Sequence, residues 1–594
     1  MPTIPRPEHP RPQWVRPCRA GVPTPAEASL VPACLNLNGE WEFQEDLDLT
    51  GERRGWPSGT PLKGRLLVPF APESSLSGIG NTDFMPCVWY RRRLRVPEDW
   101  QGNTVFLHFG AVDYAATVWL NGKLVGRHRG GYSSFSFDIT PFLRAGDNEL
   151  VVRAIDDTCS PLQPSGKQSP KPDSYGCMYT RTTGIWQTVW LEAVPPAHLR
   201  RARFLPDLPE GRLLISAPPS EPAVGLTIEA IARVDAVEVA RASGRAAVDP
   251  VALSLPIPNP RLWSPTDPFL YDLQLRLLDG DTVVDHVDSY FGMRHISLDG
   301  PAIRLNFQPL FQRLVLDQGY YPDGIYTAPT DDALRRDIEL SQQMGFNGAR
   351  LHQKVFEERF LYWADKLGYL VWGEYPNWGL DLAQMDALEH MLPEWLEVVK
   401  RDYNHPSLIG WCPFNETPNE PPRDLLRAIY WATKSADPSR PVIDTSGYTH
   451  AETDVDDCHD YTQDPQQLAD HFRAFARSGQ PWRNHPEFDA PHRGQPFFVS
   501  EYGGIWWNPG QTDAKAWGYG DRPRTEEEFL TRYRALTETL LFHPRMCGFC
   551  YTQLYDIEQE VNGLCTYDRR PKFGPSLLRA INQQQAAVER ACPS

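Results

Sequence analysis

The second half of the chain carries two glutamates in similar sequence settings. Glu416 ends the apolar run LIGWCPFNE, and Glu501 lies in PFFVSEYGG. Each run has the character of a buried strand that stops at a carboxylate, and an ionised carboxylate is costly there unless it reaches an exposed strand end. Both side chains are therefore expected at one rim of the fold. Two acids at a shared rim are the minimum equipment for cleaving a glycosidic bond.

Eight apolar runs that alternate with helical patterns explain why the two glutamates should share a rim. As predicted strands, the runs cover 310–319, 346–353, 369–374, 408–416, 441–447, 454–461, 496–504 and 547–556. Between them, segments 330–344, 356–367 and 525–541 have apolar residues spaced by three and four positions, which predicts amphipathic helices. This alternation predicts a parallel (β/α)₈ TIM barrel over residues 295–594, with its chemistry at the C-terminal ends of the strands.

Polar and aromatic residues at or just beyond these strand ends are candidates for substrate binding. They are Arg350, His352, Glu374, Trp378, Asn415, His459, Tyr461, Trp506, Gln553 and Asn562. Arg350 is the best candidate to keep Glu501 ionised, and Tyr461 could support the same carboxylate through its hydroxyl. Glu374 could pair with Arg350 or Arg313, or it could contact substrate.

The acidic run DVDDCHDY (454–461) could also indicate a metal site. Alternation along a strand divides its side chains between two faces, so few of these groups would converge on one ion. His459 in this run is either a partner for a sugar hydroxyl or a histidine satisfied by its neighbours. Since two carboxylates suffice for double displacement, no metal or other cofactor is expected.

The amino-acid composition limits the classes of partner that this protein can bind. A formal net charge of −17 over 594 residues disfavours nucleic acid and anionic membranes, because phosphate binding needs a surplus of Lys and Arg. The sequence contains no apolar run of 18 residues, so no membrane span is predicted. The 19 Trp and 23 Tyr suit the apolar faces of sugar rings, although such residues also fill cores.

The N-terminal sequence and the cysteine content both favour a cytoplasmic location. Residues 1–17 contain many prolines and no continuous apolar segment, which argues against a secretory signal. Eleven cysteines, an odd number without regular spacing, favour reduced thiols over a disulfide framework. CGFC (547–550) imitates a redox pair, but residues three apart in a strand point to opposite faces.

The first half of the chain is predicted to be all-β. Residues 35–195 contain alternating runs separated by turn signals, among them NGK at 121–123, and predict a jelly-roll sandwich in a domain of residues 1–195. Residues 196–294 carry short strands at 226–234, 271–278 and 281–292, whose number and spacing suit a small immunoglobulin-like sandwich.

Several motifs together resemble glycoside hydrolase family 2. They are LNGEWEF (37–43), LNGKLVGRHRGGYSSFSFDIT (120–140), GIWQTVWLE (184–192), YFGMR (290–294), RDYNHPSLIGWCPFNE (401–416) and SEYGG (500–504). The similarity covers nearly the whole chain, in the family's order of jelly roll, immunoglobulin-like sandwich and TIM barrel. It implies an exo-acting, retaining β-glycosidase with an Asn-Glu pair at the fourth strand and a nucleophilic Glu at the seventh, which match Asn415, Glu416 and Glu501. Relatives are often dimers or tetramers, so a homo-oligomer is expected.

Retaining chemistry requires one protonated and one ionised carboxyl. We expect Glu416 to be the acid/base, in an apolar neighbourhood formed by Trp411, Pro413 and Phe414, and Glu501 to be the nucleophile. Asn415 is expected to hydrogen-bond the sugar's 2-hydroxyl.

Departures from the family pattern bear on the substrate. Family members that act on glucuronides carry an Asn-x-Lys pair after the eighth strand, whereas Asn562 is followed here by Gly and Leu, which disfavours a glucuronide. Segment 177–183 lacks the aspartate that many relatives send from the jelly roll, and Thr552 and Gln553 stand where a tryptophan is usual. We expect a β-galactosidase-like enzyme. The alternatives are a β-glucuronidase, a β-galacturonidase, an arabinosidase or an inactive carbohydrate-binding protein. If the sugar is a uronic acid, possible partners for its carboxylate are Arg181, Lys354 and Arg569.

Overall fold

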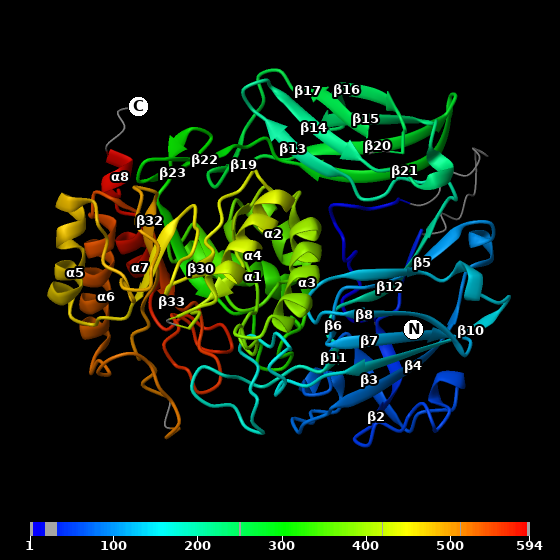
Figure 1. Cartoon of the computed structure of the whole chain (residues 1–594), viewed down its shortest axis with the longest axis horizontal. Helices are drawn as coiled ribbons and strands as arrows, with labels where there is room; N and C mark the ends of the chain where they lie inside the picture. Colours follow the sequence, from blue (N-terminus) through cyan, green and yellow to red (C-terminus); the bar gives the residue numbers. More distant parts are fainter. Residues whose placement is uncertain (1–3, 18–32, 249–250, 419, 511–512, 591–594) are drawn as a thin grey trace.

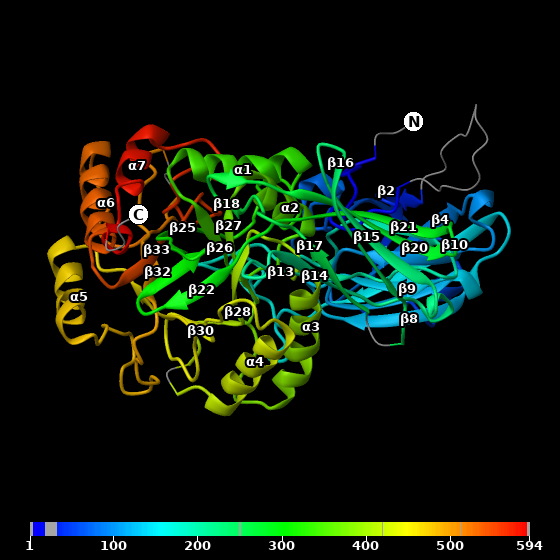
Figure 2. The same cartoon turned by 90° about the horizontal axis from the view of Figure 1, so that it is seen from above.

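The computed structural model describes residues 4–17, 33–248, 251–418, 420–510 and 513–590. The barrel occupies one side of the molecule, and the two sandwiches lie side by side on the other (Figure 1). The view from above shows the same division, with helices α1 to α7 around the barrel strands (Figure 2). The predicted class, jelly roll plus immunoglobulin-like sandwich plus TIM barrel, is confirmed. None of the helices in the described ranges has the length and apolar character needed to cross a bilayer.

Two antiparallel sheets form the jelly roll, with orders β3-β2-β4-β10-β7-β8 and β1-β12-β5-β9. The strands are β1 (Cys34–Asn36), β2 (Gly39–Glu45), β3 (Gly64–Val68), β4 (Cys87–Arg95), β5 (Thr104–Phe109), β6 (Val112–Asp113), β7 (Ala115–Leu120), β8 (Lys123–Arg129), β9 (Phe135–Asp138), β10 (Asp147–Ile155), β11 (Gly184–Ile185) and β12 (Val189–Val194). The NGK turn joins β7 to β8, with positive φ at Asn121 and Gly122, as an Asn-Gly hairpin requires. Buried Trp41, Tyr90 and Leu107 belong to one apolar cluster of this domain.

The second sandwich packs a sheet of order β13-β14-β17 against one of order β16-β15-β20-β21. Its strands are β13 (Arg203–Asp207), β14 (Arg212–Ala217), β15 (Thr227–Val234), β16 (Val237–Arg245), β17 (Val251–Pro256), β18 (Trp263–Ser264), β19 (Asp267–Pro268), β20 (Tyr271–Asp279) and β21 (Thr282–Phe291). The predicted strands at 226–234, 271–278 and 281–292 correspond to β15, β20 and β21. We propose domain boundaries near residues 195 and 294, in the connections that follow β12 and β21.

A short sheet of β22 (Ile296–Asp299), β23 (Ala302–Leu305) and β24 (Gln308–Pro309) leads into the barrel. The barrel strands are β25 (Gln312–Asp317), β26 (Gly348–Leu351), β27 (Leu370–Glu374), β28 (Leu408–Cys412), β29 (Phe414–Asn415), β30 (Thr445–Ser446), β31 (Asp456–Asp460), β32 (Phe497–Gly503) and β33 (Met546–Thr552). A seven-stranded parallel sheet has the order β28-β27-β26-β25-β33-β32-β31, and the pair β29-β30 stands between its two edges. All eight predicted runs contain strand, but the fifth run, 441–447, is reduced to β30.

Helices follow the strands as predicted. They are α1 (Asp331–Gln343), α2 (Glu358–Leu367), α3 (Asp386–Asp402), α4 (Arg423–Ala436), α5 (Pro465–Ser478), α6 (Glu526–Leu541), α7 (Pro575–Asn582) and α8 (Ala587–Arg590). Thr330 and Thr525 cap α1 and α6 through their side chains, and Gly368 ends α2 in the left-handed conformation. These caps explain why the predicted bounds of the three helices agree within two residues.

A long segment of the jelly roll, residues 156–183 between β10 and β11, lies against the barrel. Figure 1 shows it in cyan beneath the barrel, beside the red loop that follows β33. The backbone N–H groups of Ser165 and Gly166 donate to Trp378 O at 2.8 and 3.1 Å. Gly166 has φ +57, and a Cβ at this position would come within 2.3 Å of Gln353 O. This contact therefore requires a glycine and brings the jelly roll to the C-terminal mouth of the barrel.

Candidate active site

The two glutamates singled out in the sequence meet at this mouth. Glu501 lies in β32, and Glu416 follows β29 directly. One carboxylate oxygen of each, together with a ring nitrogen of His459, lies within 4.8 Å of the others. The backbone at Glu416 has φ +46, and its N–H donates to Ser446 O at 3.0 Å, which fixes this residue at the strand end. Glu416 is the more exposed of the two side chains.

Glu501 is surrounded by positive charge and hydrogen-bond donors. Arg350 Nη1 lies 3.2 Å and His459 Nε2 3.4 Å from Oε1 of Glu501, and the Tyr461 hydroxyl donates to Oε2. Burial alone would raise the pKa of this carboxyl, but the charges of His459, His352 and Arg350 and the Tyr461 hydrogen bond outweigh burial and hold the pKa far below its usual value. Glu501 is therefore ionised, as a nucleophile must be.

Glu416 has a more polar neighbourhood than its sequence suggested. His459 Nδ1 lies 2.7 Å from Oε1 of Glu416. Trp411, expected beside this carboxyl, instead donates its ring N–H to Asp437 at 2.9 Å and packs edge-on against Trp395 of α3. The expectation of an apolar pocket built by Trp411 is thus wrong. The strand is interrupted between β28 and β29, so the alternation of side chains is lost there.

His459 links the two carboxylates. Burial would lower the pKa of its imidazole, but the charge of Glu501 and the hydrogen bond to Glu416 outweigh burial and raise this pKa. Ser446 Oγ lies 3.1 Å from Nε2 of the same ring. One histidine therefore contacts both the ionised carboxylate of Glu501 and the proposed acid, Glu416.

Arg350 is the buried hub of the site. It has no exposed surface, and its Nη2 contacts Glu374 at 2.6 Å and Asn415 Oδ1 at 3.1 Å. His352 Nδ1 lies 2.9 Å from the other oxygen of Glu374. Because the Glu374 side chain is itself fully buried, it neutralises Arg350 and positions that guanidinium beside Glu501; we propose this positioning role in place of substrate contact. Arg313, the other partner considered for Glu374, pairs with Glu589.

Asn415 and Trp378 line the mouth next to Glu416. Asn415 Oδ1 is held by Arg350, whereas its Nδ2 is buried and has no hydrogen-bond partner among the described residues. Trp378 donates its ring N–H to Asn415 O at 3.2 Å. A buried amide N–H₂ without a partner is costly, so Asn415 is poised to donate to a ligand hydroxyl.

Gln553 and Asn562 belong to a closed ring of hydrogen bonds. Gln553 donates to Asn562 Oδ1 at 3.0 Å, and Asn562 donates to Glu560 Oε1 at 2.9 Å. Tyr179 of the jelly roll donates to Oε2 of Glu560, and Gln318 at the end of β25 donates to both Tyr179 and Gln553, at 3.0 and 2.7 Å. Gln553 and Asn562 thus hold Glu560, and we propose that they act on substrate through it.

The remaining residues suggested by the sequence have other neighbours. Trp506 packs beside Gly518 and under Arg522. The candidate partners for a sugar carboxylate are occupied elsewhere: Arg181 donates to backbone carbonyls, among them Lys171 O at 2.7 Å, Lys354 donates to Gly319 O at 2.6 Å, and Arg569 pairs with Asp337 at 3.1 Å.

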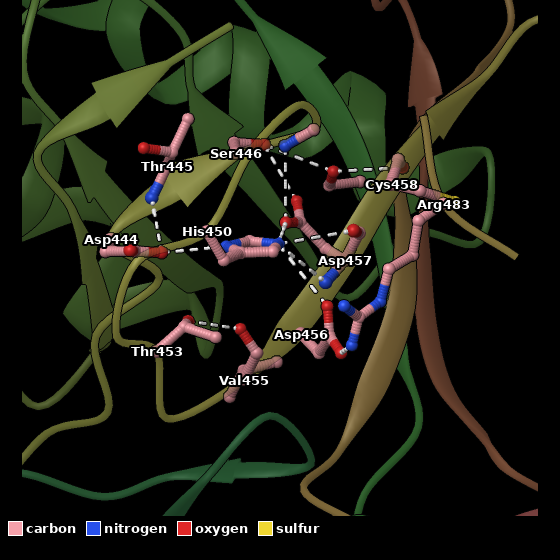
Figure 3. Close-up of polar contacts among 12 residues, drawn as sticks. Asp444, Thr445, Ser446, His450, Thr453, Val455, Asp456, Asp457, Cys458 and Arg483 are labelled. Carbon is pink, nitrogen blue, oxygen red and sulfur yellow. Dashed lines mark hydrogen bonds and ion pairs between the residues drawn. The ribbon is translucent and has the colours of Figure 1, made fainter. Parts of the chain in front are cut away.

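The aspartates of 454–460 do not converge on one point. Asp454 contacts Lys434, Asp456 contacts Arg483 and His492, and Asp460 contacts His471, at 2.6 to 3.0 Å. Figure 3 shows Asp456 and Asp457 on one side of His450 and Asp444 on the other. Within the described ranges, the one group whose ligand atoms lie close enough together for a cation is Glu416, His459 and Glu501.

His450 is a buried ion-pair centre behind the site. Its Nδ1 lies 2.7 Å from Asp444, and its Nε2 lies 3.1 Å from Asp457 and 3.4 Å from Asp456 (Figure 3). Burial would lower the pKa of the imidazole, but Asp444 and Asp457 outweigh burial and raise the pKa well above its usual value. Asp457 in turn accepts from Ser446 Oγ at 2.9 Å, next to His459.

We expect His450→Asn to destabilise the barrel by about 3–5 kcal/mol, since it leaves buried carboxylates without their cation. A raised folded-state pKa stabilises the protein fully below the unfolded pKa of histidine, about 6.5, and this stabilisation is lost as the pH rises through the folded-state pKa. Melting temperatures measured from pH 6 upward should therefore show the largest loss at pH 6. His471→Asn, which removes a partly exposed partner of Asp460, is the matched control. An equal loss in both variants at every pH would contradict the assignment.

Four residues of the site were missed by sequence reasoning: Lys167, Tyr179, Tyr519 and Glu560. Lys167 and Tyr179 lie in the jelly-roll segment 156–183, and Lys167 Nζ stands 3.9 Å above the Trp378 ring. Tyr519 stacks on Tyr461 with 3.6 Å between ring centroids. The available signal was the length of segment 156–183, since long loops without secondary structure are commonly functional.

Comparison with known proteins agrees with this architecture. Three family descriptions match in the order of the domains: "Glycosyl hydrolases family 2, sugar binding domain" over residues 78–193, "Glycosyl hydrolases family 2" over 224–294 and "Glycosyl hydrolases family 2, TIM barrel domain" over 327–587. The chain therefore belongs to glycoside hydrolase family 2.

Individual relatives differ in their substrates. A β-glucuronidase of Paenibacillus borealis is 24% identical over 599 residues, covering 92% of this chain and 96% of the relative. A β-galactosidase of Thermoanaerobacter pseudethanolicus is 26% identical over 372 residues, or 60% of this chain, and the aligned part is 48% of that enzyme's length. The chain thus spans about half of this galactosidase. A solved β-glucuronidase from Ruminococcus gnavus in complex with D-glucuronic acid superposes with a TM-score of 0.78 at 19% identity, over 93% of this chain and 97% of that one, which shows a shared fold.

Proposed function

We propose that this protein is an exo-acting, retaining β-glycosidase that removes a terminal sugar by double displacement. The observation that carries the proposal is the approach of Glu416 and Glu501, whose oxygens lie within 4.8 Å. Retaining enzymes hold their carboxyls about 5–5.5 Å apart, whereas inverting enzymes need about 6.5–9.5 Å to admit a water molecule. The spacing therefore supports attack by a carboxylate on the sugar.

Each step uses residues with a defined place in the site. Glu501 attacks the anomeric carbon while Glu416 transfers its proton to the leaving oxygen, so the aglycone departs as a neutral alcohol. Glu416 then removes a proton from water, which attacks the same carbon and releases Glu501. Arg350 and Tyr461 keep Glu501 ionised and oriented. Asn415 Nδ2 donates to the sugar's 2-hydroxyl, a bond that strengthens in the transition state.

The first substrate to test is a β-galactoside. β-Glucuronides, β-galacturonides and arabinosides are the alternatives, and relatives named for galactosidase and glucuronidase activity are both similar to this chain. A purely carbohydrate-binding role is less economical, because binding alone does not require a buried arginine hub that keeps one of two adjacent carboxylates ionised.

The stereochemistry of the product tests the mechanism. With a nitrophenyl β-glycoside as substrate, NMR should show the β-anomer of the free sugar first, because two inversions restore the starting configuration. EDTA should leave the rate unchanged, although Glu416, His459 and Glu501 approach closely enough to hold a cation. First appearance of the α-anomer, or loss of activity in EDTA that added metal restores, would contradict the proposal.

We also propose a cytoplasmic location and a homo-oligomer. In support of the first, the cysteines in the described ranges are free thiols, including Cys547 and Cys550 of the CGFC motif. Cell fractionation and light scattering are the corresponding measurements.

A further inference from the structure

Lys167 brings a buried positive charge from the jelly roll into the active site. Its side chain is 7% exposed, and its Nζ stands 3.9 Å above the ring of Trp378, which also contacts Asn415. Among the described residues it has no ion-pair partner at contact distance. Cys177 first, and then Glu560, Glu416 and Glu501, are nevertheless close enough to raise the pKa of this ammonium against the effect of burial. Three ammonium donors in such a place need acceptors, and a ligand can supply them.

The backbone around Lys167 is held rigidly. Its carbonyl accepts from Tyr179 N at 2.8 Å, and Ser165 and Gly166 are bonded to Trp378 O. The next residue, Gln168, donates to Asp113 Oδ2 at 2.8 Å and accepts from Thr182 N at 2.7 Å. A lysine fixed on both sides in this way is presented to the site at a defined position, and its side chain is not a mobile surface group.

Glu560 is a fixed acid linked to Lys167 through Tyr179, whose backbone N–H donates to Lys167 O and whose hydroxyl donates to Glu560. Tyr179 and Asn562 each donate to one of its oxygens, which orients the carboxylate as an acceptor. Burial raises the pKa of Glu560, and the Lys167 charge and the two donors oppose this rise. Glu560 is 2% exposed, so its remaining lone pairs are available only to a group that enters the barrel mouth.

We propose that Lys167 and Glu560 form a specificity pair that binds hydroxyl groups of an uncharged sugar and disfavours a uronic acid at the same place; this inference rests on the proposed glycosidase function. A sugar hydroxyl both donates and accepts, so it can satisfy an ammonium and a carboxylate at once. A sugar carboxylate cannot, since it only accepts. It would also add a second negative charge beside Glu560, at the barrel mouth where Glu416 and Glu501 lie.

The partners that the cationic residues already have support an uncharged sugar as the substrate. Arg350 is matched by Glu374 and Glu501, and Arg181, Lys354 and Arg569 are engaged elsewhere. Of these cations, Lys167 is therefore the one left for a sugar carboxylate, and Cys177, Glu560, Glu416 and Glu501 already act on its charge.

The test compares nitrophenyl β-galactoside with nitrophenyl β-glucuronide. Wild type should have the higher kcat/KM on the galactoside. Lys167→Met should lower this value about 10- to 100-fold through the loss of a charged hydrogen bond. Glu560→Gln should lower galactoside turnover but raise the ratio of glucuronide to galactoside kcat/KM at least about tenfold, because it removes the repelling charge.

Each variant has a matched control in the same loop. Lys171→Met removes an exposed lysine that lies 3.8 Å above the Tyr175 ring, and Glu558→Gln keeps an acceptor for Thr180 N; both should leave the ratio unchanged. Product inhibition of wild type supplies a test without mutation, with galactose expected to inhibit at least about tenfold more strongly than galacturonate.

The inference is overturned if wild type prefers the glucuronide, if galacturonate inhibits more strongly than galactose, or if Lys167→Met matches Lys171→Met. Such results would leave the retaining mechanism standing, because that mechanism depends on the stereochemistry of the product. Absence of hydrolysis on every glycoside would instead remove the proposed function itself.

Discussion

Glu501→Gln is expected to lower kcat by at least about 10⁴-fold on every glycoside, because the variant has no carboxylate to attack the anomeric carbon. The fold should survive. Glutamine keeps an acceptor for Tyr461, Arg350 keeps its 2.6 Å contact with Glu374, and His459 keeps its 2.7 Å contact with Glu416. The measurements are steady-state hydrolysis of dinitrophenyl and alkyl β-glycosides, together with the melting temperature.

A rescue experiment separates loss of the nucleophile from general damage. Glu501→Ala should leave space on the face of the sugar opposite the leaving group, so azide can attack there and give the α-glycosyl azide by a single inversion. Glu487→Gln, which changes an exposed glutamate of the barrel, should keep wild-type kcat. Activity of Glu501→Gln above about one per cent of wild type would show that another group attacks the sugar.

The barrel could be predicted because its signals are periodic along the chain. Apolar runs recur eight times with helical spacing in segments between them, and the residues at the strand ends, such as Arg350 and Tyr461, reach the same mouth whatever the details of packing. Prediction was weaker where a strand is interrupted. Between β28 and β29 the alternation is broken, which is why Trp411 faces α3 and not Glu416.

The second layer of the site could not be predicted from periodicity. Lys167 and Tyr179 lie in a jelly-roll segment whose position depends on its contacts with Trp378, Gln353 and Glu560. In the loop after β33 no alternation says which residue faces the mouth, and the family's Asn-x-Lys pattern drew attention to Asn562. The structure shows Asn562 as the support of Glu560, two residues earlier. Contacts between domains decide these positions, and they leave no local pattern.

Glu416→Gln is expected to separate substrates by their leaving groups. Alkyl glycosides need a proton on the departing oxygen, so their kcat/KM should fall about 10²- to 10⁴-fold, the usual contribution of general acid catalysis. The aglycone of a dinitrophenyl glycoside leaves as a stable phenolate without a proton. The first step of these substrates should therefore stay near the wild-type rate. Their second step then becomes slow, because water has lost its base, and a burst of phenolate should precede the steady state.

The acid/base role of Glu416 also predicts which glycosyl azide forms when azide rescues a variant. In Glu416→Ala, azide should attack the glycosyl-enzyme without needing a base, and the product should be the β-glycosyl azide, opposite in configuration to that from Glu501→Ala. His459 is the group that could hide this effect, since its Nδ1 lies 2.7 Å from Glu416 and could donate a proton in its place. Glu416→Gln/His459→Asn should then lose the remaining alkyl glycoside activity. If Glu416→Gln slows phenolate and alkyl glycosides equally, with no burst, then Glu416 is not the acid, and the division of roles between the two carboxylates is wrong.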